Sequence, residues 1–331
     1  MEFNFKPNRI MHDFGSYRHF IRGVKKIGKT TLFRDLVEEE YGDMSNGLLI
    51  SIGQETGHKA LANLFAWETP TWKDLWELID ELVANKASNN FKVIALDTVD
   101  ELVNLATDEM FAEHLRTKKF PAKSVNDALG GYGAGRKYVI KLLNDVIYAL
   151  ESAGYGLVFI GHTKVRDIRE KGVEDAYQVL TGAMETGYES VFADKADIIA
   201  VLYTERDVKD GAVQSSKRYI YFRDDGFVDC GTRFAGMPER VPYGAKEYLE
   251  AFRTGIKNAS GEKLTDEQLK AEAKKEEEAR IQEGLKTAKL ETLHAEVKKL
   301  CAEKVGMVSE KDFDSAVMGL FSSDDIFACK D

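Results

Sequence analysis

The sequence predicts an α/β fold, with a mostly parallel sheet flanked by helices and a helical appendage toward the C-terminal end. Over the first two-thirds of the 331 residues, short apolar runs alternate with amphipathic stretches, as strands and helices do around a parallel sheet. Several apolar runs are almost uninterrupted, which is expected of strands that are buried on both faces. From about Lys257 the chain becomes dense in Lys and Glu and poor in aromatic residues. The change in composition marks the appendage.

Within the predicted core, strands and helices follow one another in a regular order. Strands are predicted at residues 19–22, 47–53, 91–96, 156–161, 197–203 and 218–223, and helices at residues 30–40, 71–83 and 137–152. The helix after Thr71 begins with a capping box, because Asp74 stands three residues later. The last strand ends at Asp224-Asp225-Gly226, which is a turn signal.

The core and the appendage define three predicted parts of the chain. Residues 1–256 form the core, residues 257–310 a charged helical appendage, and residues 311–331 a flexible acidic tail. Five apolar residues of the appendage fall near one face, which predicts a long surface helix or a short coiled coil: Ile281, Leu285, Leu293, Val297 and Leu300.

Composition and charge restrict the class of function. No apolar run approaches the roughly 20 residues needed to cross a bilayer, and the first residues lack a signal-peptide pattern. We therefore expect a cytoplasmic protein with no membrane partner. Three cysteines, few and odd in number, predict neither a disulfide framework nor a zinc site. The net charge of −10 argues against a surface that binds nucleic acid everywhere, but it leaves room for a local basic strip.

A complete phosphate-binding pattern, G-x-x-x-x-G-K-[ST], follows the first predicted strand. Its glycines allow a sharp turn that brings backbone N–H groups against phosphate oxygens. The lysine reaches the β- and γ-phosphates, and the hydroxyl that follows it ligates Mg²⁺. A chance match in a Gly/Lys-rich turn is the alternative, but a strand before and a helix after are the context that the pattern requires. We expect ATP and Mg²⁺ to bind here, with these residues in contact: Gly23, Val24, Lys25, Lys26, Ile27, Gly28, Lys29, Thr30 and Thr31.

A second candidate ligand for the metal ends the apolar run at residues 91–97. Asp97 stands where a Walker B acid would stand, at the carboxyl end of a buried strand, and such an acid holds Mg²⁺ directly or through water. Taken alone, Asp97 is equally explained as a residue of a turn. Asp100 and Glu101 follow closely, either near the metal or as acids in the first turn of a helix.

The order of these elements resembles the RecA-like ATPase core. More narrowly, it is similar to phage-encoded AAA domain nucleotide-binding proteins of recombination modules, which act with the annealing or strand exchange of single-stranded DNA. The resemblance covers roughly residues 10–255, and its matching stretches are residues 21–32, 93–99, 157–164 and 231–234, followed by Pro238. It implies an ATPase in the cytoplasm of a bacterial host.

The resemblance also implies catalytic roles for single residues. Glu55 would orient and deprotonate the attacking water, although the usual Asp two positions earlier is absent and Ile52 and Gly53 stand nearby. His162, at a strand end, would contact the γ-phosphate and report its hydrolysis. The alternatives are a solvated loop carboxylate and a structural histidine.

RecA-like ATPases usually complete their site across a subunit boundary, so the resemblance implies a homo-oligomer, as a ring or a filament. Arg233 is our first choice for a basic residue that acts in a neighbouring subunit, ahead of Arg223 and Lys217. A surface arginine paired with an acid is the alternative for Arg233.

Two stretches are candidates for contact with single-stranded DNA. In the first stretch, residues 118–123 and 130–138 interleave glycine, aromatic and basic residues; the second, residues 164–171, includes Lys164, Arg166 and Arg169. A flexible surface loop and an ordinary charged helix face are the alternatives. Residues 324–327, Asp-Asp-Ile-Phe, are similar to the acidic-hydrophobic tails with which single-strand-binding proteins recruit partners, or they are a disordered end.

The leading hypothesis is an ATPase that acts on single-stranded DNA in phage recombination or replication, alongside a single-strand-binding or other recombination protein. One alternative is a nucleotide-dependent switch or loader that docks a protein partner through the Lys/Glu-rich helix. Another is a P-loop kinase, for which Arg116 is too isolated to form an arginine-rich lid. Stimulation of turnover by single-stranded DNA separates the first hypothesis from the others.

Overall fold

The computed structural model describes residues 9–169, 172, 175–261 and 265–304 of the chain. Residues up to Leu285 form one compact unit, and the chain from Lys286 forms a second. The predicted acidic tail at residues 311–331 lies outside the described residues. No helix in the described part of the chain is both long and apolar enough to cross a membrane.

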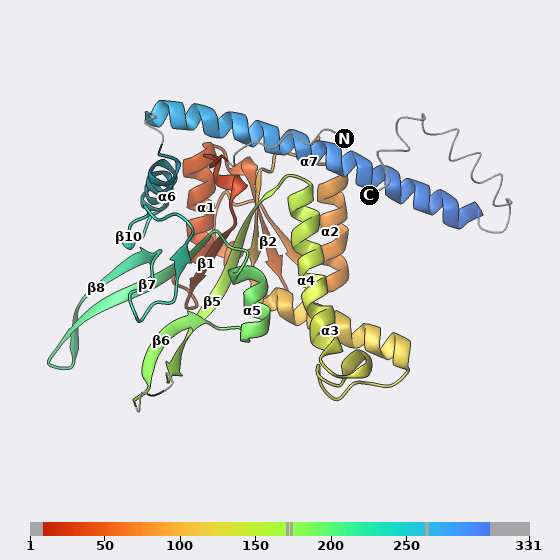
Figure 1. The fold of residues 1–331 in the computed structure, drawn as a ribbon, viewed down its shortest axis with the longest axis horizontal. Helices are drawn as coiled ribbons and strands as arrows, with labels where there is room; N and C mark the ends of the chain where they lie inside the picture. Colours follow the sequence, from red (N-terminus) through yellow and green to blue (C-terminus); the bar gives the residue numbers. More distant parts are fainter. Residues whose placement is uncertain (1–8, 170–171, 173–174, 262–264, 305–331) are drawn as a thin grey trace. The chain divides into compact units, whose positions relative to one another are not determined.

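A ten-stranded sheet, counted over the described residues, forms the centre of the first unit (Figure 1). Its main path runs β10-β8-β7-β1-β5-β4-β2-β3, while β6 pairs with β5 and β9 pairs with β7. The strands β3, β2, β4, β5, β1 and β7 are mutually parallel. The bounds are β1 His19–Gly23, β2 Gly47–Ile52, β3 Ala66–Thr69, β4 Val93–Asp97, β5 Gly156–Ile168, β6 Tyr177–Gly182, β7 Ile198–Lys209, β8 Ala212–Tyr221, β9 Gly231–Thr232 and β10 Arg240–Pro242.

Helices cover both faces of the sheet. Side chains of α2, α3, α4 and α5 form one core with alternate strand residues such as Ile50 and Phe159. Side chains of α1 and α6 form a second core with Leu49 and Val158, which lie next in sequence and point to the other face. The predicted α/β fold with a mostly parallel, helix-flanked sheet is confirmed. The bounds are α1 Lys29–Tyr41, α2 Trp72–Ala84, α3 Val99–Lys118, α4 Ala134–Ser152, α5 Thr186–Ala193, α6 Ala245–Ser260 and α7 Asp266–Lys304.

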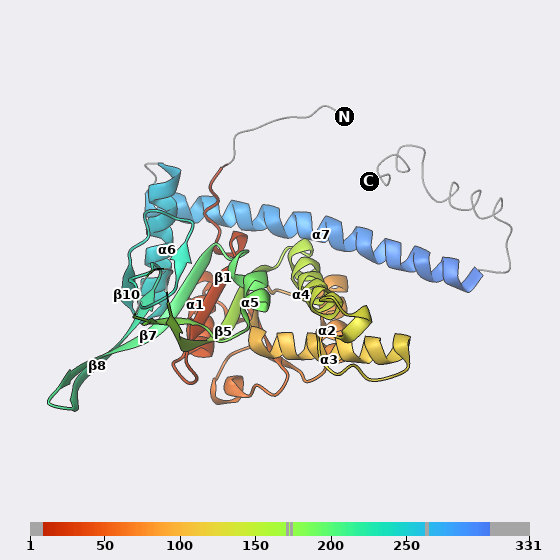
Figure 2. The same cartoon turned by 60° about the horizontal axis from the view of Figure 1, so that its bottom comes forward.

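Two β-hairpins extend from the sheet beyond what the sequence predicts. The strands β5 and β6 pair antiparallel from Thr163 to Ile168 (Figure 1). The strands β7 and β8 pair as far as Lys209 and Ala212 (Figure 2). Their outer parts are mostly exposed, so no apolar run marks them in the sequence. Residues 164–168, for which we considered a charged helix face, belong to β5 instead.

The first part of α7 packs against the amino ends of the strands. Arg280 Nη1 donates to the Gly154 carbonyl at 2.6 Å, and Arg280 Nε donates to Asp13 Oδ2 at 2.8 Å. Glu276 accepts hydrogen bonds from the backbone N–H groups of His12 and Asp13. A Cβ atom at Gly284 would lie 2.3 Å from the carbonyl oxygen before Gly154, so the helix lies close to this turn. The predicted core boundary at residues 256/257 falls inside α6, and the chain continues to contact the core beyond it.

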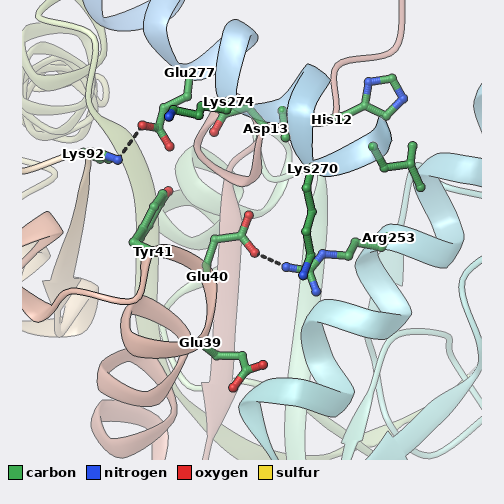
Figure 3. A pocket seen from close by; sticks show the side chains of 12 residues that line it. His12, Asp13, Glu39, Glu40, Tyr41, Lys92, Arg253, Lys270, Lys274 and Glu277 are labelled. Atoms are coloured by element: carbon green, nitrogen blue, oxygen red, sulfur yellow. Dashed lines mark hydrogen bonds and ion pairs between the residues drawn. The ribbon is translucent and has the colours of Figure 1, made fainter. Parts of the chain in front are cut away.

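A cavity of about 430 Å³ remains where α1, α6 and α7 meet (Figure 3). Ion pairs lie along its wall: Lys92 Nζ is 2.6 Å from Glu277 Oε1, and Arg253 Nη2 is 2.6 Å from Glu40 Oε2. The lining is thus charged and mutually neutralised, and it lies at the amino end of the sheet.

Candidate nucleotide-binding site

The phosphate-binding loop joins the end of β1 to the start of α1. Lys26 and Gly28 both have positive φ, of 63° and 109°, which gives the loop its tight turn. A Cβ atom at Gly28 would lie 2.5 Å from Tyr243 Oη, so a larger residue has neither the space nor a relaxed backbone there. Gly28 is also the N-cap of α1 and offers no side chain to its first N–H groups. The first turn of α1 can therefore donate to an anion.

Lys29 is buried inside this loop. Its Nζ donates to the carbonyl oxygens of Gly23 at 2.9 Å and Val24 at 3.1 Å. Burial is the main cause that lowers the pKa of Lys29, and the nearby charges of Asp97 and other acids oppose it. The ammonium group is thus held at the loop by weak neutral acceptors, which a phosphate oxygen can replace.

Thr30 and Asp97 meet although 67 residues separate them. Thr30 Oγ1 donates to Asp97 Oδ2 at 2.8 Å. The parallel register brings this about, because it aligns Asp97, the last residue of β4, with Ser51 of β2 and Ile160 of β5. Burial is the main cause that raises the pKa of Asp97, and the hydrogen bond from Thr30 opposes it. A hydroxyl and a carboxylate side by side are hard oxygen donors, and they fit Mg²⁺.

His162 and Asp100 lie on the other side of the loop. The β1/β5 register places His162 opposite Gly23, where the phosphate-binding loop begins. Asp100 Oδ2, in the first turn of α3, accepts from the His162 backbone N–H at 2.9 Å and lies 3.2 Å from His162 Nδ1. The histidine is therefore hydrogen-bonded, as its structural alternative requires, and it is also located at the predicted site. Its role as a sensor stays a prediction.

Glu55 lies in a loop that follows β2 and packs against α1. Its carbonyl oxygen accepts from Ser51 Oγ at 2.8 Å, and a Cβ atom at Gly57 would lie 3.7 Å from Thr30 Oγ1. The charge of Glu55 contributes to the shifted pKa values of both Lys29 and Asp97, after the larger effect of burial. The Glu55 carboxylate makes no hydrogen bond or ion pair with any residue that the structure describes. It is free to face a ligand, and its role as a base stays a prediction.

Arg233 lies at the opposite end of the sheet. It follows β9, whose Thr232 pairs with Ile198, and Ile198 pairs in turn with His19, the first residue of β1. Arg233 Nη2 donates to the Asp194 carbonyl at 3.1 Å, and its Nε is 3.4 Å from an oxygen of Asp197. The structure therefore does not bring Arg233 to the phosphate-binding loop of its own chain. A role in a neighbouring subunit stays a prediction.

Two residues that hold the loop escaped the sequence reasoning. Tyr243 Oη donates to the Gly28 carbonyl at 2.9 Å, and Arg218 Nη1 donates to the Ile27 carbonyl at 3.0 Å. The Arg218 guanidinium also lies 4.3 Å from the centre of the Tyr243 ring, so the two side chains support each other. They stand about 200 residues after the loop, and no local pattern marks them.

Comparison with known proteins agrees with this geometry. The family described as an AAA domain matches residues 16–234, about two-thirds of the chain. The matched range includes the phosphate-binding loop, Glu55, Asp97, His162 and Arg233. No curated protein shows significant similarity to the chain. The chain belongs to the AAA domain family and carries a nucleotide-binding domain of the ATPase type.

Proposed function

We propose that the chain binds ATP with Mg²⁺ at this site, hydrolyses it, and couples hydrolysis to single-stranded DNA in phage recombination or replication. The observation that best supports the binding of ATP with Mg²⁺ is the 2.8 Å hydrogen bond from Thr30 to Asp97. It brings the hydroxyl of the phosphate-binding loop and the acid of a second strand to one point, where a metal ion has two oxygen ligands.

Each side chain of the site has a task in this reaction. The first turn of α1 and Lys29 hold the phosphates, after the ammonium group leaves the carbonyls of Gly23 and Val24. Thr30 and Asp97 hold Mg²⁺, which when bound neutralises charge on the phosphate oxygens. Glu55 orients the attacking water and takes its proton. Asp100 holds His162 through its backbone N–H and its Nδ1 atom, at the strand position opposite Gly23.

The DNA part rests on what surrounds the carboxyl ends of the strands. The β5–β6 hairpin starts directly after His162 and exposes Lys164 and Arg169. Arg166 is instead occupied by the carbonyl oxygens of Gly182 and Met184, at 3.1 and 2.6 Å. Exposed basic side chains beside an ATPase site are an arrangement through which a strand of DNA can influence hydrolysis.

Several further statements belong to the same proposal: the RecA-like relationship, the phage origin, the bacterial cytoplasm, a ring or filament of identical subunits, and a single-strand-binding or recombination partner. The family resemblance supports them. The alternatives gain no specific support from the described residues. Arg116 pairs with Glu113 on α3 rather than forming part of a lid, and Arg280 of the Lys/Glu-rich helix is engaged with the core.

Hydrolysis of Mg-ATP with and without single-stranded DNA tests the proposal. We expect turnover that rises with DNA, and its loss in Lys29→Ala. The matched control is Lys257→Ala, which removes an exposed lysine of α6 and leaves turnover as it is. Turnover that does not respond to DNA would refute the DNA role. Turnover that survives in Lys29→Ala would refute the site.

A further inference from the structure

A second cavity adjoins the candidate nucleotide site. It measures about 490 Å³ and lies between α3, the start of α4, the start of α5 and the loop at residues 124–126. Asp100 lines it and at the same time binds His162 of the nucleotide site. Only the side chain of Asp100 therefore separates a ligand in this cavity from His162, the predicted sensor.

The charged side chains that line the cavity already have partners within the protein. Arg136 Nη2 forms an ion pair with Glu185, and its guanidinium lies 5.5 Å from the centre of the Tyr188 ring. Asp100 is bound to His162. The lining contains two carboxylates and one guanidinium, so it disfavours a phosphate or another anion. An uncharged ligand fits it better.

Two amide side chains at the rim of the cavity are available for hydrogen bonds to a ligand. Asn104 of α3 and Asn126 of the loop are exposed, line the cavity, and form no side-chain hydrogen bond with any residue in the described ranges. Each offers donors and an acceptor. Behind them, Met184 and Tyr188 are buried and provide an apolar wall. A flat, neutral group with donors and acceptors along one edge matches this combination of amides and an aromatic ring.

We propose that this cavity receives one unpaired nucleobase of single-stranded DNA. Bases outside a duplex are held in protein pockets by hydrogen bonds to their edge and by contact with aromatic side chains. The segments that line the cavity also carry exposed lysines that can contact phosphates of the same strand, because Lys123 precedes the lining residue Ser124 and Lys137 follows Arg136. This inference rests on the proposed function and adds to it the part of the DNA that the protein contacts specifically, which is a single base.

The loop between α3 and α4 adds a second aromatic group. Tyr132 is fully exposed, and a Cβ atom on the preceding Gly131 would lie 3.8 Å from the Asn126 carbonyl oxygen. Because Tyr132 is fully exposed in the loop that also carries Asn126, its ring is available for a neighbouring base to stack on. A base in the cavity also touches the surroundings of Asp100, which gives DNA a direct contact with the group that holds His162.

The experiment compares two probes on the full chain with Mg-ATP: an oligothymidylate, and an abasic oligonucleotide of the same length that keeps the phosphates. We expect the wild-type chain to bind the oligothymidylate at least about tenfold more tightly. The double variant Asn104→Ala/Asn126→Ala is expected to lose most of this preference, leaving only the part that stacking on Tyr132 supplies, and to keep the weaker, salt-sensitive binding of the abasic strand. The matched control is Asn258→Ala, an exposed asparagine of α6, which keeps the preference.

The outcomes separate the two proposals. Equal binding of both probes by the wild-type chain overturns the base pocket and leaves an ATPase that contacts DNA through phosphates alone. A preference that stays as large in the double variant as in the wild-type chain, with an unchanged melting temperature, also overturns the pocket. If the wild-type chain binds neither probe, the DNA role itself fails. Stacking on Tyr132 is checked separately with Tyr132→Ala, which is expected to reduce affinity for the oligothymidylate while Asn126 still discriminates the abasic probe.

Discussion

Removing one hydroxyl group from Tyr243 tests how the phosphate-binding loop is held. In Tyr243→Phe the hydrogen bond to the Gly28 carbonyl is lost, while the ring that contacts Arg218 remains. A hydrogen bond of this kind contributes about 0.5–1.5 kcal/mol net. If the bond keeps the loop in its binding shape, its loss lowers the equilibrium constant for that shape by roughly 2- to 12-fold. The apparent Kd for ATP rises by up to the same factor.

Calorimetric titration of Mg-ATP into the variant measures this change, and urea unfolding measures the stability of the same sample. Tyr148→Phe is the matched control, because Tyr148 is exposed on α4. Arg218→Met removes the neighbouring bond to the Ile27 carbonyl. Since the two side chains are in contact, we expect the double variant to differ from the sum of the single ones by at least about 0.5 kcal/mol. An ATP affinity equal to that of Tyr148→Phe would refute the reasoning.

Three further predictions concern the metal ligands, acid stability and a buried ion pair. Thr30→Val is expected to weaken Mg²⁺-dependent ATP binding at least roughly tenfold, whereas Thr30→Ser keeps the hydroxyl and most of the binding; titrations with and without Mg²⁺ compare them. His19 is fully buried, and burial lowers its pKa from 6.5 to about 4. The unfolded chain therefore binds more protons between these values, so stability falls as the pH drops from 6.5 to 4, by about 3 kcal/mol. Urea unfolding at several pH values measures this slope, which His19→Phe should flatten; an equal slope in the variant contradicts the assignment. Glu189→Gln removes the carboxylate charge that lies 2.5 Å from the buried Arg22 guanidinium and leaves Arg22 with Asp229, at 3.4 Å, as its acidic partner. We expect a loss of about 3 kcal/mol in thermal unfolding, against less than about 1 kcal/mol for Glu250→Gln at an exposed pair.

The sequence could predict two kinds of site residue: those that form one continuous motif along the chain, and those that end a buried strand. The loop from Gly23 to Thr31 and Asp97 carry their own local context, and parallel register then brings Thr30 to Asp97. Tyr243 and Arg218 could not be found in this way. Their contacts span 215 and 191 residues, and neither stands in a pattern that differs from an ordinary surface.

For the fold, too, local patterns could be predicted from the sequence, whereas contacts between distant residues could not. Buried strands such as β4 and the first part of β5 were predicted because both of their faces are apolar. The short edge strand β3 was not predicted, since it has only four residues and Trp67 within it is exposed. The change in composition near Lys257 indicated where the charged surface begins. It gave no indication that Arg280 returns to bind the turn before β5.

The docking of α7 has a practical consequence for single-molecule work. Its contacts with Asp13 and Gly154 lie before β1 and β5, whereas the phosphate-binding loop follows β1 at the far end. Gln282 is exposed on this docked part of the helix. A chain tethered to a glass surface through a label at Gln282 thus presents the candidate nucleotide-binding site and both hairpins to the solution. Substrate delivery and fluorescence from the opposite end would be unobstructed by the support.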